Sequence, residues 1–253
     1  MLRNKDIERG RVMNYRDKIY EGYDKDLQKR MSLSTVEKER KMISKYVKRN
    51  YLRYIPKDKN ITILDLGCGM GHYLAVLQDM GYSNVKGVDI SEGNVRFCKA
   101  DGLDVVCQDA EEYLNTHKNQ YDVIIFNDVI EHFKKEEVMP LLVLIKESLK
   151  DGGIVITKTD NEANPFCGIS GRYMDFTHEL GFVSLSLQQI YEAAEFKNVE
   201  VIGADIYVWG GVVSYLVKII SKIVYFVHYL LCCMAGRWSI RIFEKCIICK
   251  AEK

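Results

Sequence analysis

The residues best suited to chemistry lie in the stretch ILDLGCGMGHYL, residues 63–74. An apolar run containing Asp65 leads into three glycines at alternate positions, a pattern typical of a strand that enters a tight turn and then a helix. These glycines are Gly67, Gly69 and Gly71. Glycine lets the main chain approach a ligand closely and adopt dihedral angles that other residues avoid. A second apolar run, VKGVDI, ends near Asp89, where an acidic side chain can accept hydrogen bonds from ribose hydroxyls. The two runs together predict a nucleoside-binding crevice.

The spacing of the glycines separates this turn from a dinucleotide-binding one. The fingerprint G-x-G-x-x-G needs a third glycine at a place that here holds His72, counting from Gly67, or Leu74, counting from Gly69. The spacing is instead D-x-G-x-G-x-G, with Asp65 just before the turn. A carboxylate at that position suits a cationic ligand better than a pyrophosphate.

Four segments, LDLGCGMGHYL, GVDI, QDAEEYL and YDVIIFNDVIEHF, resemble in this order the motifs of class I S-adenosylmethionine-dependent methyltransferases. They cover roughly residues 60 to 160, and their combination is specific, whereas a lone G-x-G would indicate only an ordinary strand-to-helix turn. In that family the glycine loop wraps the amino-acid part of the cofactor, the acid after the second strand holds the ribose, and the acid after the third meets the adenine.

The resemblance implies S-adenosyl-L-methionine as the cofactor and a binding set drawn from the ends of four strands. The expected members are Asp65, Gly67, Cys68, Gly69, Gly71, Asp89, Ile90, Asp109, Ala110, Asn127 and Asp128.

Candidate catalytic residues follow the fourth predicted strand. The resemblance directs Glu131 and His132 toward the methyl acceptor, and a histidine has a pKa suited to general-base work at neutral pH. The alternative is that His132 only fixes its loop through a backbone hydrogen bond. Transfer of a methyl group from a sulfonium requires positioning and proton removal but no metal, so no metal site is expected. The segment NDVI lacks the prolines and the aromatic residue of the [DN]-P-P-[YF] motif of nucleic-acid amino-methyltransferases, and no nucleic-acid partner is expected.

A second candidate group lies in the long loop that follows residue 159. Its segment GRYMDFTHELGF resembles a loop of methyltransferases encoded with bacterial surface-polysaccharide genes, in which His178 would be a second base candidate. Arg172 and Lys158 could hold a phosphate or a uronate carboxylate, with Tyr173 beside them, because cationic side chains fit such oxyanions. The competing interpretation is that Arg172 and Asp175 merely pin the loop.

The elements that would position these residues alternate between strand and helix patterns, which favours a parallel sheet with crossover helices. Strands are predicted near 61–66, 84–89, 104–107, 121–126 and 153–158, and helices near 71–80, 92–100, 110–115 and 136–150. Three local signals refine this pattern. Ser91 is a predicted N-cap, the sequence 151–153 (DGG) is predicted to close the fourth helix, and Ser186 with Gln189 predicts a capping box. Pro140 should lie in a first helical turn or mark a kink.

The predicted fold is α/β: a doubly wound, seven-stranded, mostly parallel Rossmann-like methyltransferase sheet whose last strand runs antiparallel. Residues 1–58 would form a helical cap, 59–208 with 243–253 the methyltransferase domain, and 209–242 an apolar helical insertion. A chain of 253 residues can bury such a core.

Charge is divided unevenly along the chain. Residues 1–60 hold 18 Lys and Arg against 9 Asp and Glu, a net charge of +9, while the remainder holds 18 against 26, a net charge of −8. A basic arm on an acidic body could face phosphates, anionic lipid or an anionic substrate, or it could be a solvated helical face with paired charges. The eight cysteines and the charged start from Arg3 onward favour reduced thiols and a cytoplasmic location.

Residues 209–235 are apolar enough to suggest a membrane span. Lys218 and Lys222 count against a lone span, since a lysine at a helix centre costs about 2.5–3.5 kcal/mol on insertion scales. Because they are four residues apart they share one helical face, as in a helix that lies in the membrane interface. Peripheral docking at the inner face of the membrane is the first expectation. Packing on the domain or in a homodimer is the second, and a true span is the third.

Three functions remain open at this point. The first is methylation of an oxygen of a sugar, sugar phosphate or nucleotide-linked glycan precursor in surface-polysaccharide (capsule or lipopolysaccharide) biosynthesis. The second is a small-molecule O-methyltransferase of the quinone-biosynthesis type, whose lipid-tailed substrates would equally explain an apolar insertion. The third is a cofactor-binding scaffold without catalysis, which the intact motif set disfavours.

Overall fold

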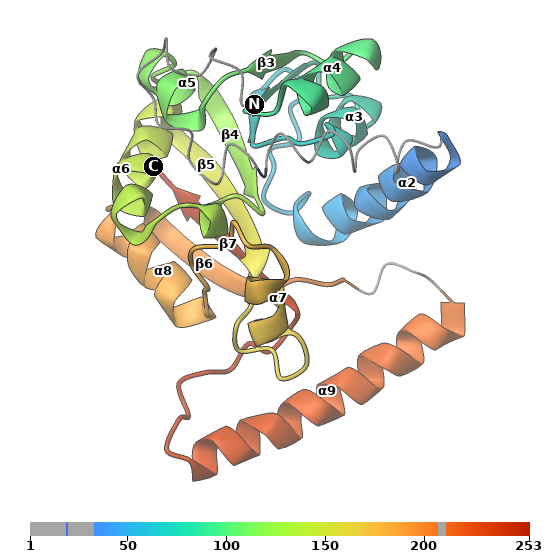
Figure 1. Ribbon diagram of the computed structural model, residues 1–253, viewed down its shortest axis with the longest axis vertical. Helices are drawn as coiled ribbons and strands as arrows, with labels where there is room; N and C mark the ends of the chain where they lie inside the picture. The colour runs from blue at the N-terminus through green and yellow to red at the C-terminus, as the bar shows by residue number, and fades with distance from the viewer. Residues whose placement is uncertain (1–18, 20–32, 207–210) are drawn as a thin grey trace, which may run out of the picture.

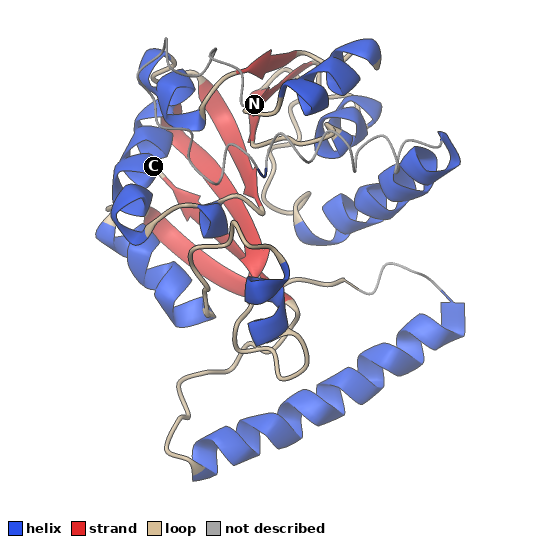
Figure 2. Ribbon diagram, viewed as in Figure 1, coloured by secondary structure: helices blue, strands red, loops and turns tan. Residues whose placement is uncertain are grey.

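The alternating strands and helices of this chain form one seven-stranded sheet with helices on both faces, shown by a computed structural model that describes residues 19, 33–206 and 211–253 (Figures 1 and 2). The strand order is β3-β2-β1-β4-β5-β7-β6. The strands are β1 (Thr62–Leu66), β2 (Asn84–Asp89), β3 (Val105–Cys107), β4 (Tyr121–Asn127), β5 (Leu149–Asp160), β6 (Lys197–Gly203) and β7 (Cys246–Glu252). The helices are α2 (Leu33–Asn50), α3 (His72–Asp79), α4 (Glu92–Ala100), α5 (Ala110–Thr116), η1 (Ile130–His132), α6 (Lys135–Ser148), α7 (Gly168–Met174), α8 (Ser184–Ala193) and α9 (Gly211–Met234).

The sheet is buried on both faces because successive apolar side chains of its central strands point to opposite sides. Ile63 of β1 packs in the core beneath α2, α3 and α4, whereas the next residue, Leu64, packs in the core beneath α5, α6 and α8. Val123 and Ile124 of β4 divide in the same way. This two-sided core confirms the doubly wound fold predicted from the sequence.

The final hairpin also confirms the prediction. Strand β7 pairs antiparallel with both β5 and β6, while the other strand pairs are parallel. Helix α9 lies in the connection between β6 and β7, and Figure 1 shows it standing away from the sheet, beyond α7. The apolar insertion is therefore a helix between two hairpin strands; the domain boundaries proposed around it stay a prediction.

Helix α2 belongs to the predicted N-terminal cap, of which residues 1–18 and 20–32 lie outside the described part of the chain. Its Tyr46 and the following Tyr51 are buried against Tyr73 of α3, with Tyr51 and Tyr73 stacked at a centroid distance of 5.9 Å. The amide Nδ2 of Asn50 donates to the carbonyl of Asp205, 3.1 Å away, which ties the end of α2 to the chain that leaves β6. These tyrosines pack the helix onto the domain.

Two of the predicted helix-end signals, one near α6 and one near α8, do not match the structure. The prediction that residues 151–153 close a helix is wrong, because α6 ends at Ser148 and Leu149 already pairs with Tyr121 of β4. Leu149 is fully buried in the sheet, so burial of its side chain overrides the C-cap signal, and Gly152, at φ +73°, lies in the irregular part of β5. Pro140 lies inside α6, beyond the first turn.

Helix α8 begins earlier than expected. It starts at Ser184, so the predicted capping box of Ser186 with Gln189 is wrong; the Ser186 hydroxyl instead accepts from the backbone N–H of Val183 at 3.1 Å. Ser91 is confirmed as the N-cap of α4, since its hydroxyl accepts from the N–H of Asn94 at 3.3 Å. The long loop contains a helix, α7, whose glycines weaken the periodic signal that would have predicted it.

Candidate functional site

The strand order brings the predicted cofactor residues to one edge of the sheet. Strands β1 and β4 are neighbours, and the crossovers from them leave toward opposite faces, which is where open α/β sheets bind ligands beyond their carboxyl ends. The glycine turn follows β1, Asp89 ends β2, Asp109 follows β3 and Asn127 ends β4. Residues spread over more than sixty positions of sequence thus share one crevice edge.

Two glycines of the turn are needed for different reasons. The N–H groups of Gly67 and Cys68 both donate to the carbonyl of Val88, at 2.8 and 3.0 Å, which fixes the turn to β2. Gly67 has φ +76°, and a Cβ there would lie 2.3 Å from a methyl of Val129. Gly69 has φ +53°, but a Cβ there would meet nothing within 4 Å. The space above Gly69 is open, as close approach of a ligand to the main chain requires.

Replacing Gly69 by alanine should therefore separate ligand binding from folding. A left-handed conformation costs an L-residue about 1–2 kcal/mol, so a moderate fall in thermal midpoint is expected. Gly81→Ala is the matched control, because Gly81 also has a positive φ (+92°) and open space but follows the carboxyl end of α3, the end away from the turn. Both variants should lose similar stability in thermal unfolding. Only Gly69→Ala should weaken cofactor binding in calorimetry, by roughly tenfold or more; equal affinities in the two would contradict this role.

Asp89 is held at the end of β2 beside the glycine turn, and its ribose contact stays a prediction. Its carboxylate accepts from the N–H of Gly69 at 2.7 Å and from the N–H of Ser91 at 2.9 Å. The next residue, Ile90, is 52% exposed, a large apolar side chain beside the crevice that could cover an adenine face. Asp109 caps α5 by accepting from the N–H groups of Glu111 and Glu112 at 2.8 and 3.2 Å, which places Ala110 in the first turn of that helix.

Two buried polar atoms at the ends of β1 and β4 fit a bound polar ligand. Oδ2 of Asp65 and Nδ2 of Asn127 are both buried without a hydrogen-bond partner among the described residues. The other amide atom of Asn127, Oδ1, accepts from the hydroxyl of Tyr51 at 2.6 Å, so the Nδ2 group is the one directed elsewhere. Unpaired buried polar groups are costly, and a ligand with an ammonium group and a carboxylate would satisfy both. The residues present therefore fit the amino-acid part of S-adenosylmethionine.

Sequence reasoning missed the role of Tyr51. A tyrosine near the end of an amphipathic helix carries no signal beyond packing, and only the tertiary structure brings its hydroxyl to Asn127.

The protonation of Asp65 should make cofactor affinity depend on pH. Burial and the nearby charge of Asp89 raise the pKa of Asp65 to about 7. A cationic ligand needs the ionised carboxylate, so binding below pH 7 must release a proton. Affinity should rise by about tenfold per pH unit from pH 5.5 toward 7 and then level off. Calorimetry in buffers of different ionisation enthalpy would measure the proton release.

Asp65→Asn provides the control for this pH dependence. Because the folded protein binds more protons at Asp65 than the unfolded chain between about pH 4 and 7, the ligand-free protein loses stability as pH rises through that window. Asp65→Asn should therefore raise the thermal midpoint at pH 8 while weakening cofactor binding and removing its pH dependence below 7. A variant that keeps the wild-type affinity profile would show that Asp65 does not meet the cation.

Asp128 and Lys158 form a pair at the ends of β4 and β5. Asp128 has φ +52°, uncommon outside glycine, and its carboxylate is in contact with the Lys158 ammonium. The Lys158 ammonium also lies 5.7 Å from the ring centroid of Tyr46. Since its charge is already matched by Asp128, the predicted role of Lys158 in holding a substrate oxyanion remains a prediction without a contact that favours it.

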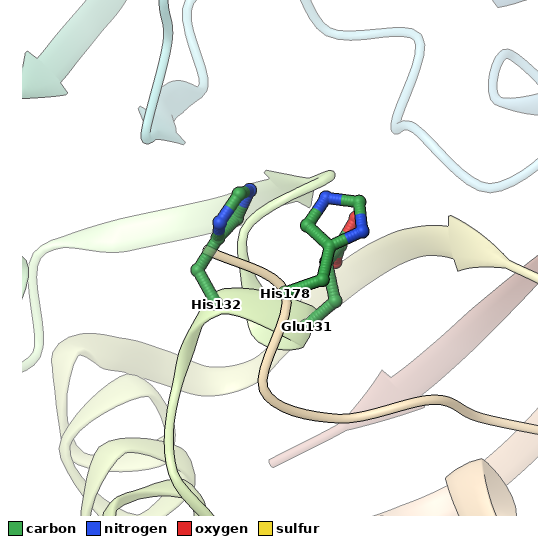
Figure 3. Close-up of side chains that lie close together, drawn as sticks. All are labelled: Glu131, His132 and His178. Carbon is green, nitrogen blue, oxygen red and sulfur yellow. The ribbon is translucent and has the colours of Figure 1, made fainter. Parts of the chain in front are cut away.

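The two candidate catalytic groups, separate in sequence, meet in the structure (Figure 3). Glu131 and His132 lie in η1, and His178 reaches them from the loop before α8. One ligand-type atom from each of the three lies within 4.8 Å of the others, and the two histidine rings meet edge to face at a centroid distance of 4.7 Å. The backbone carbonyl of Glu131 accepts from the N–H groups of Glu179 and Leu180, at 2.8 and 3.0 Å, which anchors the loop. This spacing could also hold a metal ion; the expectation that none is needed stays a prediction.

The hydrogen bonds around His132 fix its tautomer. The hydroxyl of Thr177 donates to Asp175 at 2.7 Å, so its oxygen can only accept from Nδ1 of His132, 2.8 Å away. The proton of the neutral ring therefore lies on Nδ1, and Nε2 carries the lone pair that a general base needs. Burial, followed by the neighbouring His178, lowers the pKa of His132 to about 4, which keeps the ring neutral at pH 7.

The neighbouring groups complete the cluster. His178 places Nδ1 3.2 Å from the carbonyl of Gly171 in α7. Burial and the charge of Asp128 raise the pKa of Glu131 to about 8, and its carboxyl accepts from the hydroxyl of Thr159 at 3.0 Å. This shift favours the neutral form of Glu131. Thr177 and Thr159 are positioning residues that the sequence did not single out, because threonines in loops and strands carry no chemical signature of their own.

Two of the proposed substrate residues, Arg172 and Tyr173, lie on α7, next to this cluster. A guanidinium nitrogen of Arg172 donates to the carbonyl of Glu179 at 2.7 Å, which favours the pinning role for at least part of this side chain. Tyr173 is 75% exposed. A cavity of about 560 Å³ opens between α7 and α9, lined by apolar side chains that include Phe166, Ile169 and Phe243.

The comparisons with known proteins agree with this geometry. The sequence model of a methyltransferase domain family matches residues 37–201. No curated protein sequence matches the chain. A SAM-dependent methyltransferase from Archaeoglobus fulgidus is 21% identical, with a TM-score of 0.63, 85% of this chain and 94% of that one being covered.

Two further solved structures share the fold. Phosphoethanolamine N-methyltransferase 2 of Haemonchus contortus, in complex with S-adenosyl-L-methionine, is 18% identical with a TM-score of 0.57 over 79% of this chain and 50% of that one. A putative O-methyltransferase from Nostoc punctiforme PCC 73102 is 13% identical with a TM-score of 0.59 over 93% of this chain and 60% of that one. At these identities the likeness shows the fold.

Proposed function

The chain belongs to the methyltransferase domain family, and from this premise we propose that it methylates an oxygen of a sugar, sugar phosphate or nucleotide-linked precursor of a surface polysaccharide. It is a methyltransferase whose cofactor is S-adenosyl-L-methionine. The choice of an oxygen and of a glycan acceptor is the proposal. The proposed location is the cytoplasm, at the inner face of the membrane.

The observation that carries the proposal is the oriented base beside the cofactor edge. The Asp175–Thr177–His132 chain of hydrogen bonds presents Nε2 of His132 as a proton acceptor. A hydroxyl acceptor keeps its proton at neutral pH, so a base placed to remove it is what O-methylation requires. His178 stands next to it and could take the same proton in a different acceptor pose.

The reaction would need only modest chemistry from the protein. When bound, the cofactor would supply an electrophilic methyl group on a sulfonium, with the neutral thioether as the leaving group. The turn at Gly67–Gly71 and Asp89 would hold the cofactor still, while the loop of α7 would hold the acceptor in line. His132 would take the hydroxyl proton on Nε2 and become an imidazolium, whose charge the Asp175 carboxylate supports through Thr177.

The acceptor class is proposed from the loop that borders the base. Arg172 of α7 carries a guanidinium that fits a phosphate or a uronate carboxylate, and Glu179 and Asp175 supply acceptors for sugar hydroxyls. A second candidate remains: a lipid-tailed phenol of the quinone type. The exposed apolar side chains of this region, Ile169, Met174 and Phe176, favour it.

Transfer of labelled methyl from S-adenosylmethionine into fractionated extract of source cells that lack this protein would test the proposal. Label in the polymer, lipid-linked glycan or phosphorylated-sugar fraction supports a glycan acceptor. Label that extracts with neutral phenolic lipids supports the quinone-type enzyme instead. Mild alkaline hydrolysis of the labelled product would then separate a methyl ether, which survives it, from a methyl ester, which is released as methanol. A methylated amine would be recognised by its retention on a cation exchanger.

A further inference from the structure

Helix α9 presents an unusual surface for a protein in water. Over its 24 residues no side chain is buried, and an 18-residue stretch of it has a mean hydropathy of 1.7, which would suit a membrane-crossing helix by length and composition. The exposed apolar side chains are Val212, Val213, Tyr215, Leu216, Val217, Ile219, Ile220, Ile223, Phe226, Val227, Leu230, Leu231 and Met234. A contiguous exposed apolar surface of this kind marks a site that a lipid membrane or another molecule covers.

The polar face of α9 is the one turned toward the protein. The half-buried residues recur at helical spacing, and six of the nine carry a polar group: Ser214, Lys218, Ser221, Val224, Tyr225, His228, Tyr229, Cys232 and Cys233. Lys218 pairs with Asp205 at 2.7 Å, and the hydroxyl of Tyr225 accepts from Asn164 at 3.3 Å. The ring of His228 meets Phe243 edge to face at 4.9 Å. The amphipathicity is thus inverted relative to a surface helix that packs on its own core.

The charge around α9 is one-sided. From residue 206 to residue 243 the sequence contains no Asp or Glu, while it contains Lys218, Lys222, Arg237 and Arg241. Lys222, Arg237 and Arg241 are exposed. Trp238, just beyond the helix, is 63% exposed, and tryptophan is enriched at membrane interfaces. Exposed cations beside an apolar face complement anionic headgroups above acyl chains.

The connections of α9 exclude a crossing. Its ends join β6 and β7, which are paired neighbours, so the chain must return to the side from which it left. After Met234 only residues 235–245 are available for the return, and they are not helical. To return across a hydrocarbon core of about 30 Å, this segment would have to cross it as extended backbone. Its N–H and C=O groups would then be unsatisfied in lipid, and Arg237 and Arg241 would have to enter the core as well. The helix must therefore lie along the surface.

We propose that α9 is an in-plane membrane anchor that inserts its outer apolar face into the headgroup boundary of an anionic phospholipid bilayer. Its polar face then remains against the catalytic domain, and Lys222, Arg237 and Arg241 meet the headgroups. The apolar positions occupy roughly half of the circumference, wider than the narrow seam that a second copy of α9 would cover in a coiled coil. A bilayer covers a face of that width without a matching partner.

Flotation with vesicles tests the proposal on the full chain. The wild type should float with vesicles of phosphatidylcholine mixed with phosphatidylglycerol and should bind much less to phosphatidylcholine alone. The triple variant Ile220→Glu, Ile223→Glu, Val227→Glu should lose roughly tenfold or more in partitioning. Val143→Glu with Leu185→Glu is the control, because these side chains are exposed and apolar on α6 and α8. Lys222→Gln with Arg237→Gln should reduce binding to anionic vesicles and its sensitivity to salt.

The possible results distinguish a membrane from a second copy of the protein as the partner of the apolar face of α9. If the wild type stays unbound with both vesicle types, or the triple variant floats as well as the wild type, the proposal fails. A wild type that is dimeric by light scattering, does not float, and becomes monomeric in the triple variant would assign the face to a second copy. Cofactor affinity, measured by calorimetry on the same proteins, should be unchanged in all variants. Membrane docking is thereby tested independently of the proposed acceptor.

Discussion

Replacement of Asp89 by alanine is expected to abolish measurable cofactor binding, with a loss of roughly a hundredfold or more in affinity. Two effects combine. The variant removes the acceptor that would hold the ribose hydroxyls, and it removes the carboxylate that accepts from the N–H groups of Gly69 and Ser91. The glycine turn would thus lose both its ligand contact and part of its support. Isothermal titration calorimetry with S-adenosylmethionine measures the affinity.

Two variants separate these effects. Glu92→Ala removes an exposed acid three residues further on, which pairs with Arg96 within its own helix, and it should bind the cofactor as the wild type does. Asp89→Asn retains an acceptor oxygen and should show an intermediate loss. Unchanged affinity in Asp89→Ala would mean that the register assigned to β2 and its ribose contact is wrong.

Alanine at His132 or His178 is expected to cut turnover by roughly 10²–10⁴-fold while cofactor affinity stays nearly constant. His132 should have the larger effect, because Thr177 and Asp175 fix its tautomer for proton acceptance. Thr177→Val, which removes the acceptor for Nδ1–H, should cause a smaller loss of kcat with little change in KM. The acceptor fraction labelled in the extract experiment provides the substrate.

The pH profile gives an independent check on His132. With its pKa lowered to about 4, the ring stays neutral well below pH 6, so the rate at saturating cofactor should hold down to about pH 5 before it falls. The same shift means that the unfolded chain binds more protons than the folded protein between pH 6.5 and 4, so stability falls as pH falls through this window. His132→Ala should lessen that fall.

His117→Ala serves as the control for this experiment, since His117 stacks on Tyr113 at 3.8 Å, on α5 and away from the cluster. Treatment with a chelator tests the expectation that no metal takes part, and an unchanged rate is expected. If the His132 and His178 variants both keep full activity, neither histidine is the base. Loss of activity on chelation would instead assign the cluster of Glu131, His132 and His178 to a metal.

Much of the cofactor edge was predictable from sequence because its signals are local. The glycines after β1 and the acid at the end of β2 sit at turns whose geometry depends on a few neighbouring residues. The parallel sheet brings those turns to the same edge whatever the helices between them contain. The apolar character of residues 211–234, and the strand that returns after it, were likewise visible as runs of residue type.

Local signals failed where burial competed with them. The two glycines near Asp151 predicted a helix end, but the demand to bury Leu149 beside Tyr121 drew the chain into β5 first. The predicted N-cap Ser186 lies three residues beyond the actual N-cap, Val183, since a hydroxyl can accept from the backbone from within the first turn as well as before it.

The sequence by itself determined the class of fold, the glycine turn, the acids that follow the strands and the identity of the two candidate histidines. Only the tertiary structure decided that His132 and His178 belong to one cluster, that Thr177 and Asp175 orient it, and that Tyr51 reaches Asn127. It also decided that the polar face of α9 turns inward to Asp205 and leaves the apolar face outside. The physical reason is that turns and periodic faces are set by residues a few positions apart, whereas these contacts join segments tens of residues apart whose approach depends on packing the whole sheet.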